Sequence, residues 1–174
     1  MREERGLILL NTGNGKGKTT AAIGVAFRAL GHGLRVGMLQ FIKGKWKTGE
    51  RKLGEHTAGL TWLTMGRGFT WESEDLGRDR EAARTAWKTA QEWLSGDVFD
   101  IVILDEITYV VNYGFVRVGE VVAALQNRRT GLHVILTGRA APPELIAVAD
   151  LVTDMHPVKH PYQDGVRAQK GVEF

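Results

Sequence analysis

The sequence predicts an α/β fold of three layers, in which a mostly parallel sheet lies between two layers of helices. Short runs that are apolar nearly throughout, such as residues 100–106 (DIVILDE), are typical of strands buried on both faces. Segments with helical spacing of apolar residues separate these runs, as expected of parallel strands joined by crossover helices. With 174 residues and 43% hydrophobic content the chain can build a substantial core, so we expect residues 1–174 to form a single domain.

The first half of the chain is expected to alternate strands and helices. Residues 6–11 (GLILLN) form an apolar run that ends in turn residues, which predicts a buried strand. Over residues 18–30 alanine and valine recur at helical spacing, and the glycines that follow end this helix. Residues 35–41 (RVGMLQF) predict the next strand, and residues 60–65 (LTWLTM) predict another after a glycine-rich, basic region.

The second half repeats this alternation. Residues 74–94 contain good helix formers, with apolar side chains along one side at three-and-four spacing. The apolar run at 100–106 is expected to be a buried strand that ends in two acids. The remaining elements are expected as a helix at 117–127, a strand at 132–138, a proline-started helix at 142–148 and a last strand at 150–155.

The stretch NTGNGKGKTT, directly after the first expected strand, resembles a phosphate-binding loop. The P-loop pattern requires a glycine, four residues and then Gly-Lys-Ser/Thr; Gly17, Lys18 and Thr19 supply its end, but Thr12 stands where the first glycine belongs. A strand before the loop and a helix after it would present backbone N–H groups and a helix N-terminus to an anion. We expect Lys18 to contact phosphate oxygens, Lys16 to add charge and the Thr19 hydroxyl to ligate Mg²⁺. The loop therefore favours a P-loop NTPase (RecA-like) fold, and a plain turn between strand and helix would not need two lysines and a threonine at these offsets.

Two acids follow the apolar run VIL. Asp105 and Glu106 stand at the carboxyl end of a predicted strand, where parallel sheets bind ligands and NTPases hold Mg²⁺. An acidic residue there can also serve only as a helix N-cap. Together with the loop, the pair indicates contact with a metal or a nucleotide, without dividing these roles between the two side chains.

Other candidate residues are less specific. His156 and His160 have the spacing of metal ligands on a helix, but Pro157 and Pro161 interrupt a helix there, so both histidines are expected in a loop. The remaining histidines have no companions, and Trp62, Trp87 and Trp93 are expected in the core or on helix faces.

Phe69 and Trp71 flank Thr70 in a loop that begins Gly-Arg-Gly. Two large aromatic side chains so close together can simply anchor such a loop. The alternative is an apolar platform for a flat ligand.

Charge and composition exclude several classes of protein. The net charge of +3 is too small to indicate a nucleic-acid partner, and no apolar run approaches the roughly 20 residues that span a bilayer, so we expect a cytoplasmic protein without nucleic-acid or membrane partners. The absence of cysteine excludes disulfides, thiolate nucleophiles and cysteine zinc sites. The basic segment at residues 43–52 is either a solvated face or an anion-attracting rim beside the phosphate site.

Six blocks of sequence, in order, resemble the P-loop type of ATP:corrinoid adenosyltransferase. They are TGNGKGKTTAA, QFIKGKW with GER, MGRGFTWE, VILDEITY, LTGR and the tail from HPVKH to GVRAQKGVEF, and together they cover about residues 6–174. Loops of that family read T-G-x-G-K-G-K-T, so Thr12 fits the family pattern. Family members often carry a longer segment before the first strand that helps to cover the site, whereas about five residues precede it here.

The resemblance implies transfer of the 5′-deoxyadenosyl group of ATP to Co(I) of a reduced corrinoid, cobalamin or cobyrinic acid a,c-diamide, with release of triphosphate, in adenosylcobalamin biosynthesis or salvage. It implies Mg²⁺, a homodimer and an electron donor such as a flavoprotein. It places Phe69 and Trp71 beneath the corrin, where they displace the lower axial ligand, and makes them catalytic together with Lys18. The nucleotide contacts that it implies are Gly13, Asn14, Gly15, Lys16, Gly17, Lys18, Thr19 and Thr20, with Glu106 beside the nucleotide and Arg28 at the ribose.

Two other functions share the loop. A small-molecule kinase would transfer a phosphoryl group and release ADP, and usually has an arginine-rich lid. A RecA-like ATPase or nucleic-acid motor would also release ADP and would use Glu106 as the general base for water. An adenosyltransferase instead needs no activated side chain, because Co(I) is itself the nucleophile, which agrees with the lack of cysteine.

Overall fold

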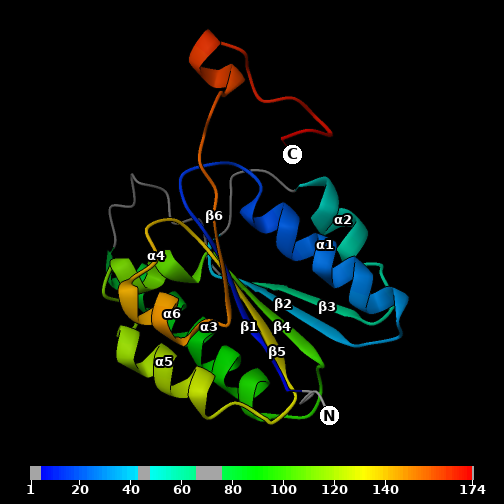
Figure 1. Cartoon of the computed structure of the whole chain (residues 1–174), viewed down its shortest axis with the longest axis vertical. Coiled ribbons are helices and arrows are strands. Elements are labelled where there is room, and N and C mark those ends of the chain that lie inside the picture. Colours follow the sequence, from blue (N-terminus) through cyan, green and yellow to red (C-terminus); the bar gives the residue numbers. More distant parts are fainter. Residues whose placement is uncertain (1–4, 43–47, 66–75, 174) are drawn as a thin grey trace.

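A parallel sheet of six strands forms the centre of the protein (Figure 1). The computed structural model describes residues 5–42, 48–65 and 76–173. Its strands lie in the order β3-β2-β4-β5-β1-β6, and every neighbouring pair is parallel. The strands are β1 (Ile8–Thr12), β2 (Val36–Gln40), β3 (Leu60–Thr64), β4 (Ile101–Asp105), β5 (His133–Thr137) and β6 (Leu151–Asp154).

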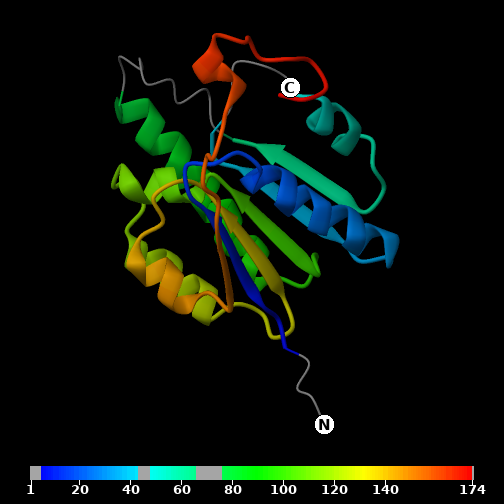
Figure 2. The ribbon, with the colours of Figure 1, turned by 45° about the horizontal axis from the view of Figure 1, so that its top comes forward.

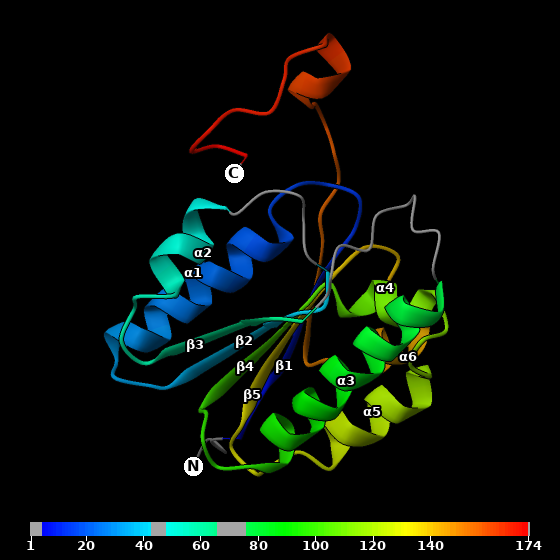
Figure 3. The same ribbon diagram turned by 180° about the vertical axis from the view of Figure 1, so that it is seen from behind.

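Helices cover both faces of this sheet (Figure 3). One face carries α1 (Lys18–Gly31) and α2 (Gly49–Gly54). The other carries α3 (Leu76–Ser95), α4 (Ile107–Asn112), α5 (Val118–Gln126) and α6 (Pro143–Val148). The α/β class and the three layers predicted from the sequence are confirmed.

Each face of the sheet buries its own apolar cluster. Beneath α1 the cluster consists largely of small helix residues such as Ala22 and Ala26 against Met38 and Ile103 of the strands. Alanine lets the helix backbone lie close to the sheet, which brings the first turn of α1 near the strand ends. The larger cluster lies beneath α3 to α6 and contains the aromatic side chains Trp87, Phe99 and Phe115. The expected core position of Trp87 is confirmed.

All the strands and longer helices lie where the sequence predicts them, with ends shifted by one or two residues. Two short helices are not anticipated, α2 within the glycine-rich basic region and α4 directly after the predicted acidic strand end. Each has six residues, too few for a helical period to show in the sequence. The last strand differs in burial, because β6 is exposed along its length as an edge strand rather than buried.

After β6 the chain leaves the sheet at its carboxyl edge (Figure 2). Residues 155–173 are mostly exposed and contain one short 3₁₀ helix, η1 (Pro161–Asp164). His160 caps η1 by accepting the Tyr162 N–H at Nδ1, and His156 pairs with Asp154. Both histidines are thus loop residues, as predicted.

Within the described ranges, no group of three or more histidine, aspartate or glutamate side chains is arranged to hold a metal ion. Nor does any helix among the described residues combine the length and apolar character needed to cross a bilayer.

Candidate active site

The phosphate-binding loop lies between β1 and α1, at the carboxyl edge of the sheet. Gly13 and Gly17 adopt left-handed backbone conformations, with φ of 92° and 112°. Only glycine enters this region without strain, so the two residues let the loop turn back on itself before α1 begins at Lys18. The predicted strand, loop and helix order is confirmed.

Lys18 points into this loop. Its side chain is 7% exposed, and Nζ donates to the carbonyl oxygens of Gly13 at 2.9 Å and Gly15 at 2.7 Å. Burial lowers the pKa of Lys18, and the neighbouring carboxylate of Glu106 opposes this shift. A phosphate oxygen at this position would give the ammonium group a charged acceptor in place of a neutral carbonyl.

Asp105 is the buried carboxylate of the site, with 3% of its surface exposed. Oδ1 accepts hydrogen bonds from the Thr19 hydroxyl at 2.8 Å and the Thr137 hydroxyl at 2.7 Å, and Oδ2 accepts one from Gln40 Nε2 at 3.0 Å. Burial raises the pKa of Asp105, whereas the three donors act in the opposite direction. The structure thus brings together Thr19 and Asp105, two of the three residues that the sequence put forward for a metal, the third being Glu106.

Glu106 follows in a strained conformation. Its φ of 62° is left-handed, which is costly for a residue with a side chain, and its N–H donates to the Thr137 hydroxyl at 3.0 Å. Its Oε2 atom is buried without a hydrogen-bond partner in the described part of the chain. Burial and the adjacent Asp105 raise the pKa of Glu106 to about 7, against the effect of Lys18 and Arg139. The two acids at the strand end therefore differ, because hydrogen bonds hold Asp105 whereas Glu106 has a carboxylate oxygen without a partner among the described residues.

Arg139 joins the site from the loop after β5. Its charge acts on both Lys18 and Glu106, so it lies within electrostatic range of the loop centre. Two side chains of α4 hold its backbone, because the Thr108 hydroxyl and Asn112 Nδ2 donate to the Arg139 carbonyl at 2.7 and 3.5 Å. The sequence analysis used the block LTGR only as part of a resemblance. A lone arginine after a strand offers no spacing that would have singled it out.

The chain after β6 also contacts the phosphate-binding loop. Gly15 donates its N–H to the Met155 carbonyl at 2.5 Å, so this amide is engaged by the tail. A Cβ at Gly15 would lie 2.7 Å from the Met155 carbonyl carbon and oxygen. Near the end of the tail, Glu173 forms an ion pair with Lys16. The tail thus contacts two of the loop residues expected to bind phosphate.

Comparison with known proteins decides the family. The family model described as ATP:corrinoid adenosyltransferase BtuR/CobO/CobP matches residues 4–174. The chain belongs to this family. Similar relatives include corrinoid adenosyltransferases of a Sinorhizobium species (47% identity) and of Escherichia coli K12 (46% identity), each aligned over 99% of this chain and over 82% and 88% of their own lengths. The corrinoid adenosyltransferase CobA of Salmonella typhimurium is 45% identical, over 99% of this chain and 88% of its own length.

A solved structure supports the fold alone. The flagellar accessory protein FlaH of Methanocaldococcus jannaschii superposes with a TM-score of 0.55 at 12% identity, over 86% of this chain and 70% of that protein. The likeness agrees with the α/β architecture and says nothing of substrate.

Family membership directs attention to the remaining predicted site residues. Asn14 and Thr20 are exposed on the loop and on the first turn of α1. Arg28 is exposed in the last turn of α1, about 15 Å along the axis from Lys18 at the helical rise per residue, so the structure does not bring it to the loop. Phe69 and Trp71 lie outside the described residues.

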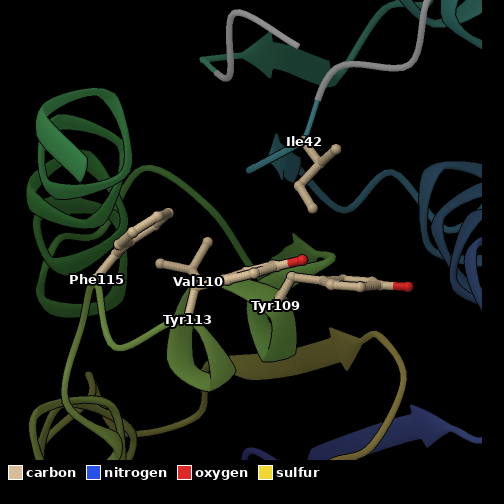
Figure 4. Close-up of a pocket in the computed structure, with 5 residues that line it drawn as sticks. All are labelled: Ile42, Tyr109, Val110, Tyr113 and Phe115. Atoms are coloured by element: carbon tan, nitrogen blue, oxygen red, sulfur yellow. The ribbon is translucent and has the colours of Figure 1, made fainter. Parts of the chain in front are cut away.

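A cluster of apolar and aromatic side chains lies on and around α4 (Figure 4). Its members are Ile42, Tyr109, Val110, Tyr113 and Phe115. The rings of Tyr113 and Phe115 stack with centroids 5.7 Å apart. Burial raises the pKa of Tyr109, and the charge of Glu106 adds to this shift.

Substitution of Gly15 by alanine tests the contact between the loop and the tail. The added Cβ would displace either the Met155 backbone or the loop, so we expect Gly15→Ala to weaken MgATP binding about tenfold or more, measured by calorimetry. Gly24, within α1, is the matched control because a Cβ there meets nothing within 4 Å. Gly24→Ala should leave binding unchanged and stabilise the fold by about 0.5–1 kcal/mol. Equal binding by both variants would contradict the prediction.

The raised pKa of Glu106 predicts a pH-dependent stability. The folded chain holds this proton to about pH 7, whereas the unfolded chain releases it near 4.5. Stability is therefore lost as pH rises from about 4.5 to about 7 and is constant above that, so Glu106→Gln should stabilise the fold by about 1 to 3 kcal/mol at pH 8. Urea unfolding at pH 8 and pH 4 measures this. A gain of the same size at both pH values would exclude Glu106 as its source.

Proposed function

We propose that the protein transfers the 5′-deoxyadenosyl group of ATP to Co(I) of a reduced corrinoid, either cobalamin or cobyrinic acid a,c-diamide, and releases triphosphate. Its role would lie in adenosylcobalamin biosynthesis or salvage. The observation that carries the proposal is the match of residues 4–174 to the corrinoid adenosyltransferase family. The buried Lys18 inside its loop and the Asp105–Thr19 pair beside it support the nucleotide half of the reaction.

In this reaction the main task of the protein is to stabilise the triphosphate leaving group. Cobalt(I) attacks the 5′ carbon, a Co–C bond forms, and the C5′–O bond breaks with its electron pair on the triphosphate. No side chain has to be activated as a nucleophile, so the protein acts by positioning and by charge. Lys18 and the N-terminus of α1 would stabilise the negative charge that grows on the triphosphate, and Arg139 adds a further positive charge within range.

Thr19 and Asp105 are the residues that would hold Mg²⁺. Their oxygen atoms are already in contact at 2.8 Å, and Mg²⁺ is usually bound by one or two protein groups completed by phosphate and water. This fits a site with no larger cluster of ligands among the described residues. The ion supplies neutralisation of the phosphate charge, while Glu106, with its unpartnered Oε2, is placed to contact the nucleotide.

Several parts of the proposal rest on the resemblance in sequence. Phe69 and Trp71 would lie beneath the corrin and displace its lower axial ligand, which eases reduction of Co(II) to Co(I). A homodimer, a cytoplasmic location and an electron donor such as a flavoprotein belong to the same proposal, as does a single domain over residues 1–174.

The products separate this function from a kinase or an ATPase. Incubation with MgATP, a chemical reductant and cobalamin should yield adenosylcobalamin, seen in its absorption spectrum, together with triphosphate. Lys18→Ala should reduce the rate about a hundredfold or more, because the buried cation facing the leaving group is lost. Lys88→Ala, which removes an exposed lysine of α3, is the control and should retain the wild-type rate. Formation of ADP in the absence of corrinoid would contradict the proposal.

The aromatic pair predicts a selective defect. Trp71→Ala should slow the reaction that starts from Co(II) cobalamin far more than the reaction that starts from chemically pre-reduced Co(I), because only the former requires loss of the lower ligand. The two rates are followed by the same spectroscopic assay, so pre-reduced corrinoid is the internal control. Equal losses in both assays would remove the proposed role of Trp71.

A further inference from the structure

A row of polar side chains crosses four strands at the carboxyl edge of the sheet. Register pairs Gln40 of β2 with Thr64 of β3 on one side and with Asp105 of β4 on the other. Thr137 of β5 continues the row, one residue beyond the pair Leu104 and Leu136. These side chains stand on the α1 face, since residues two positions earlier on β2, β4 and β5 belong to the apolar cluster beneath α1.

Gln40 is the centre of this row and has a defined orientation. Its Oε1 atom accepts the indole N–H of Trp62 at 2.9 Å and the hydroxyl of Thr64 at 3.1 Å. An indole N–H can only donate, so it requires the oxygen of the amide to face β3. The amide nitrogen then faces the other way and donates to Asp105 Oδ2 at 3.0 Å.

The hydrogen bond from Gln40 restrains the orientation of the Asp105 carboxylate. With Oδ2 held by Gln40, Oδ1 is left toward Thr19 and Thr137, whose hydroxyls contact it at 2.8 and 2.7 Å. Rotation of the carboxyl group would break the bond to Gln40 while leaving a buried donor unsatisfied, which is costly. In the part of the chain that the structure describes, the Gln40 side chain has no hydrogen bond to the P-loop, so we expect its influence to act through Asp105.

The same amide connects the sheet interior with its β3 edge. The Trp62 ring packs beneath α2, since a Cβ on Gly54 would lie 2.5 Å from the ring. The side chain of Gln40 therefore links Asp105 by hydrogen bonds to the indole beneath α2. No other side chain of the described residues bonds to both Asp105 and β3 in this structure.

We propose that Gln40 is a positioning residue of the adenosyl-transfer site, which holds Asp105 in its metal-binding orientation and couples that orientation to Trp62. This inference rests on the proposed function for the identity of the nucleotide and the metal. It assigns to Gln40 a role in the Mg²⁺ dependence of ATP binding. It also assigns to Trp62 a polar contact beyond the core position expected from the sequence.

Two variants of Gln40 test its hydrogen bonds to Asp105 and to β3. Gln40→Leu removes both the donor and the acceptor, whereas Gln40→Met keeps the length of the side chain and a weak acceptor, the thioether sulfur, but cannot donate to Asp105. Both should raise the Mg²⁺ concentration that half-saturates ATP binding by about tenfold or more, the usual effect of losing a group that orients a metal ligand. ATP binding is measured by calorimetry across a series of Mg²⁺ concentrations.

Thr64 and Thr61 provide a matched pair on one strand. Thr64 bonds to Gln40, while Thr61 is exposed on the opposite face of β3. Thr64→Val should raise the half-saturating Mg²⁺ concentration less than Gln40→Leu does, since Trp62 still holds the amide, and Thr61→Val should not change it. If Gln40→Leu does not fold, Gln40→Met and Thr64→Val carry the test. A half-saturating Mg²⁺ concentration within about twofold of wild type in Gln40→Met would overturn the proposal.

The Trp62 indole gives a readout that does not depend on turnover. The chain has five tryptophans, and the Trp62 indole N–H resonance is assigned by its loss in Trp62→Phe. In the wild type it should shift on addition of ATP with Mg²⁺ but not of ATP with EDTA, and in Gln40→Leu it should move upfield and no longer respond. A merely structural role for Gln40 would lower stability without removing this response. A wild-type resonance unmoved by MgATP would also overturn the coupling.

Failure of this inference and failure of the proposed function give different results. The binding and resonance measurements contain no corrinoid, so they report on Gln40 even if adenosyl transfer is absent. Wild-type protein that binds MgATP with the expected Trp62 shift but forms no adenosylcobalamin would overturn the proposed function alone. Wild-type protein that forms adenosylcobalamin, with unaltered Mg²⁺ dependence in Gln40→Met, would overturn the role of Gln40 alone.

Discussion

The buried carboxylate of Asp105 is the group around which the site is built. A carboxylate with 3% of its surface exposed needs donors to offset the loss of hydration, and three side chains from three different elements supply them. These donors connect the first turn of α1, β2 and β5 to the end of β4. The requirement to solvate one charge therefore fixes the relative positions of the P-loop helix and the central strands.

Two acidic and two basic side chains lie close together around Asp105, so each affects the charge of the others. Lys18 and Arg139 favour the ionised form of Glu106, while burial and Asp105 oppose it, which leaves the pKa of Glu106 at about 7. Lys18 in turn satisfies its ammonium group with loop carbonyls. A polyphosphate would add negative charge beside Lys18 and Arg139, which suits a site that has to stabilise a highly charged leaving group.

The tail completes the loop by contacts of another kind. The Met155 carbonyl receives the Gly15 N–H, and the neighbouring backbone leaves no room for a side chain on that glycine. From the sequence, Gly15 is explained by the close approach of a phosphate group. The structure adds a second reason, because the Met155 backbone also lies too close for a side chain at this position. The exposed edge strand β6 ends directly before Met155, so its position in the sheet places the tail next to the loop.

The sequence alone determined the α/β class, the order of the main elements, the loop around Lys18 and the acidic pair, because these depend on local periodicity and on residues close together in the chain. It also indicated the family, because each block of residues typical of the family is a continuous stretch of sequence. It did not reveal the short helices α2 and α4, whose six residues are too few for a period, or the place of Arg139. Only the tertiary structure decided that Gln40 bonds to both Asp105 and Trp62, and that the tail bonds to Gly15. These contacts join residues far apart in the chain, and the register of parallel strands, which no local pattern records, is what brings them together.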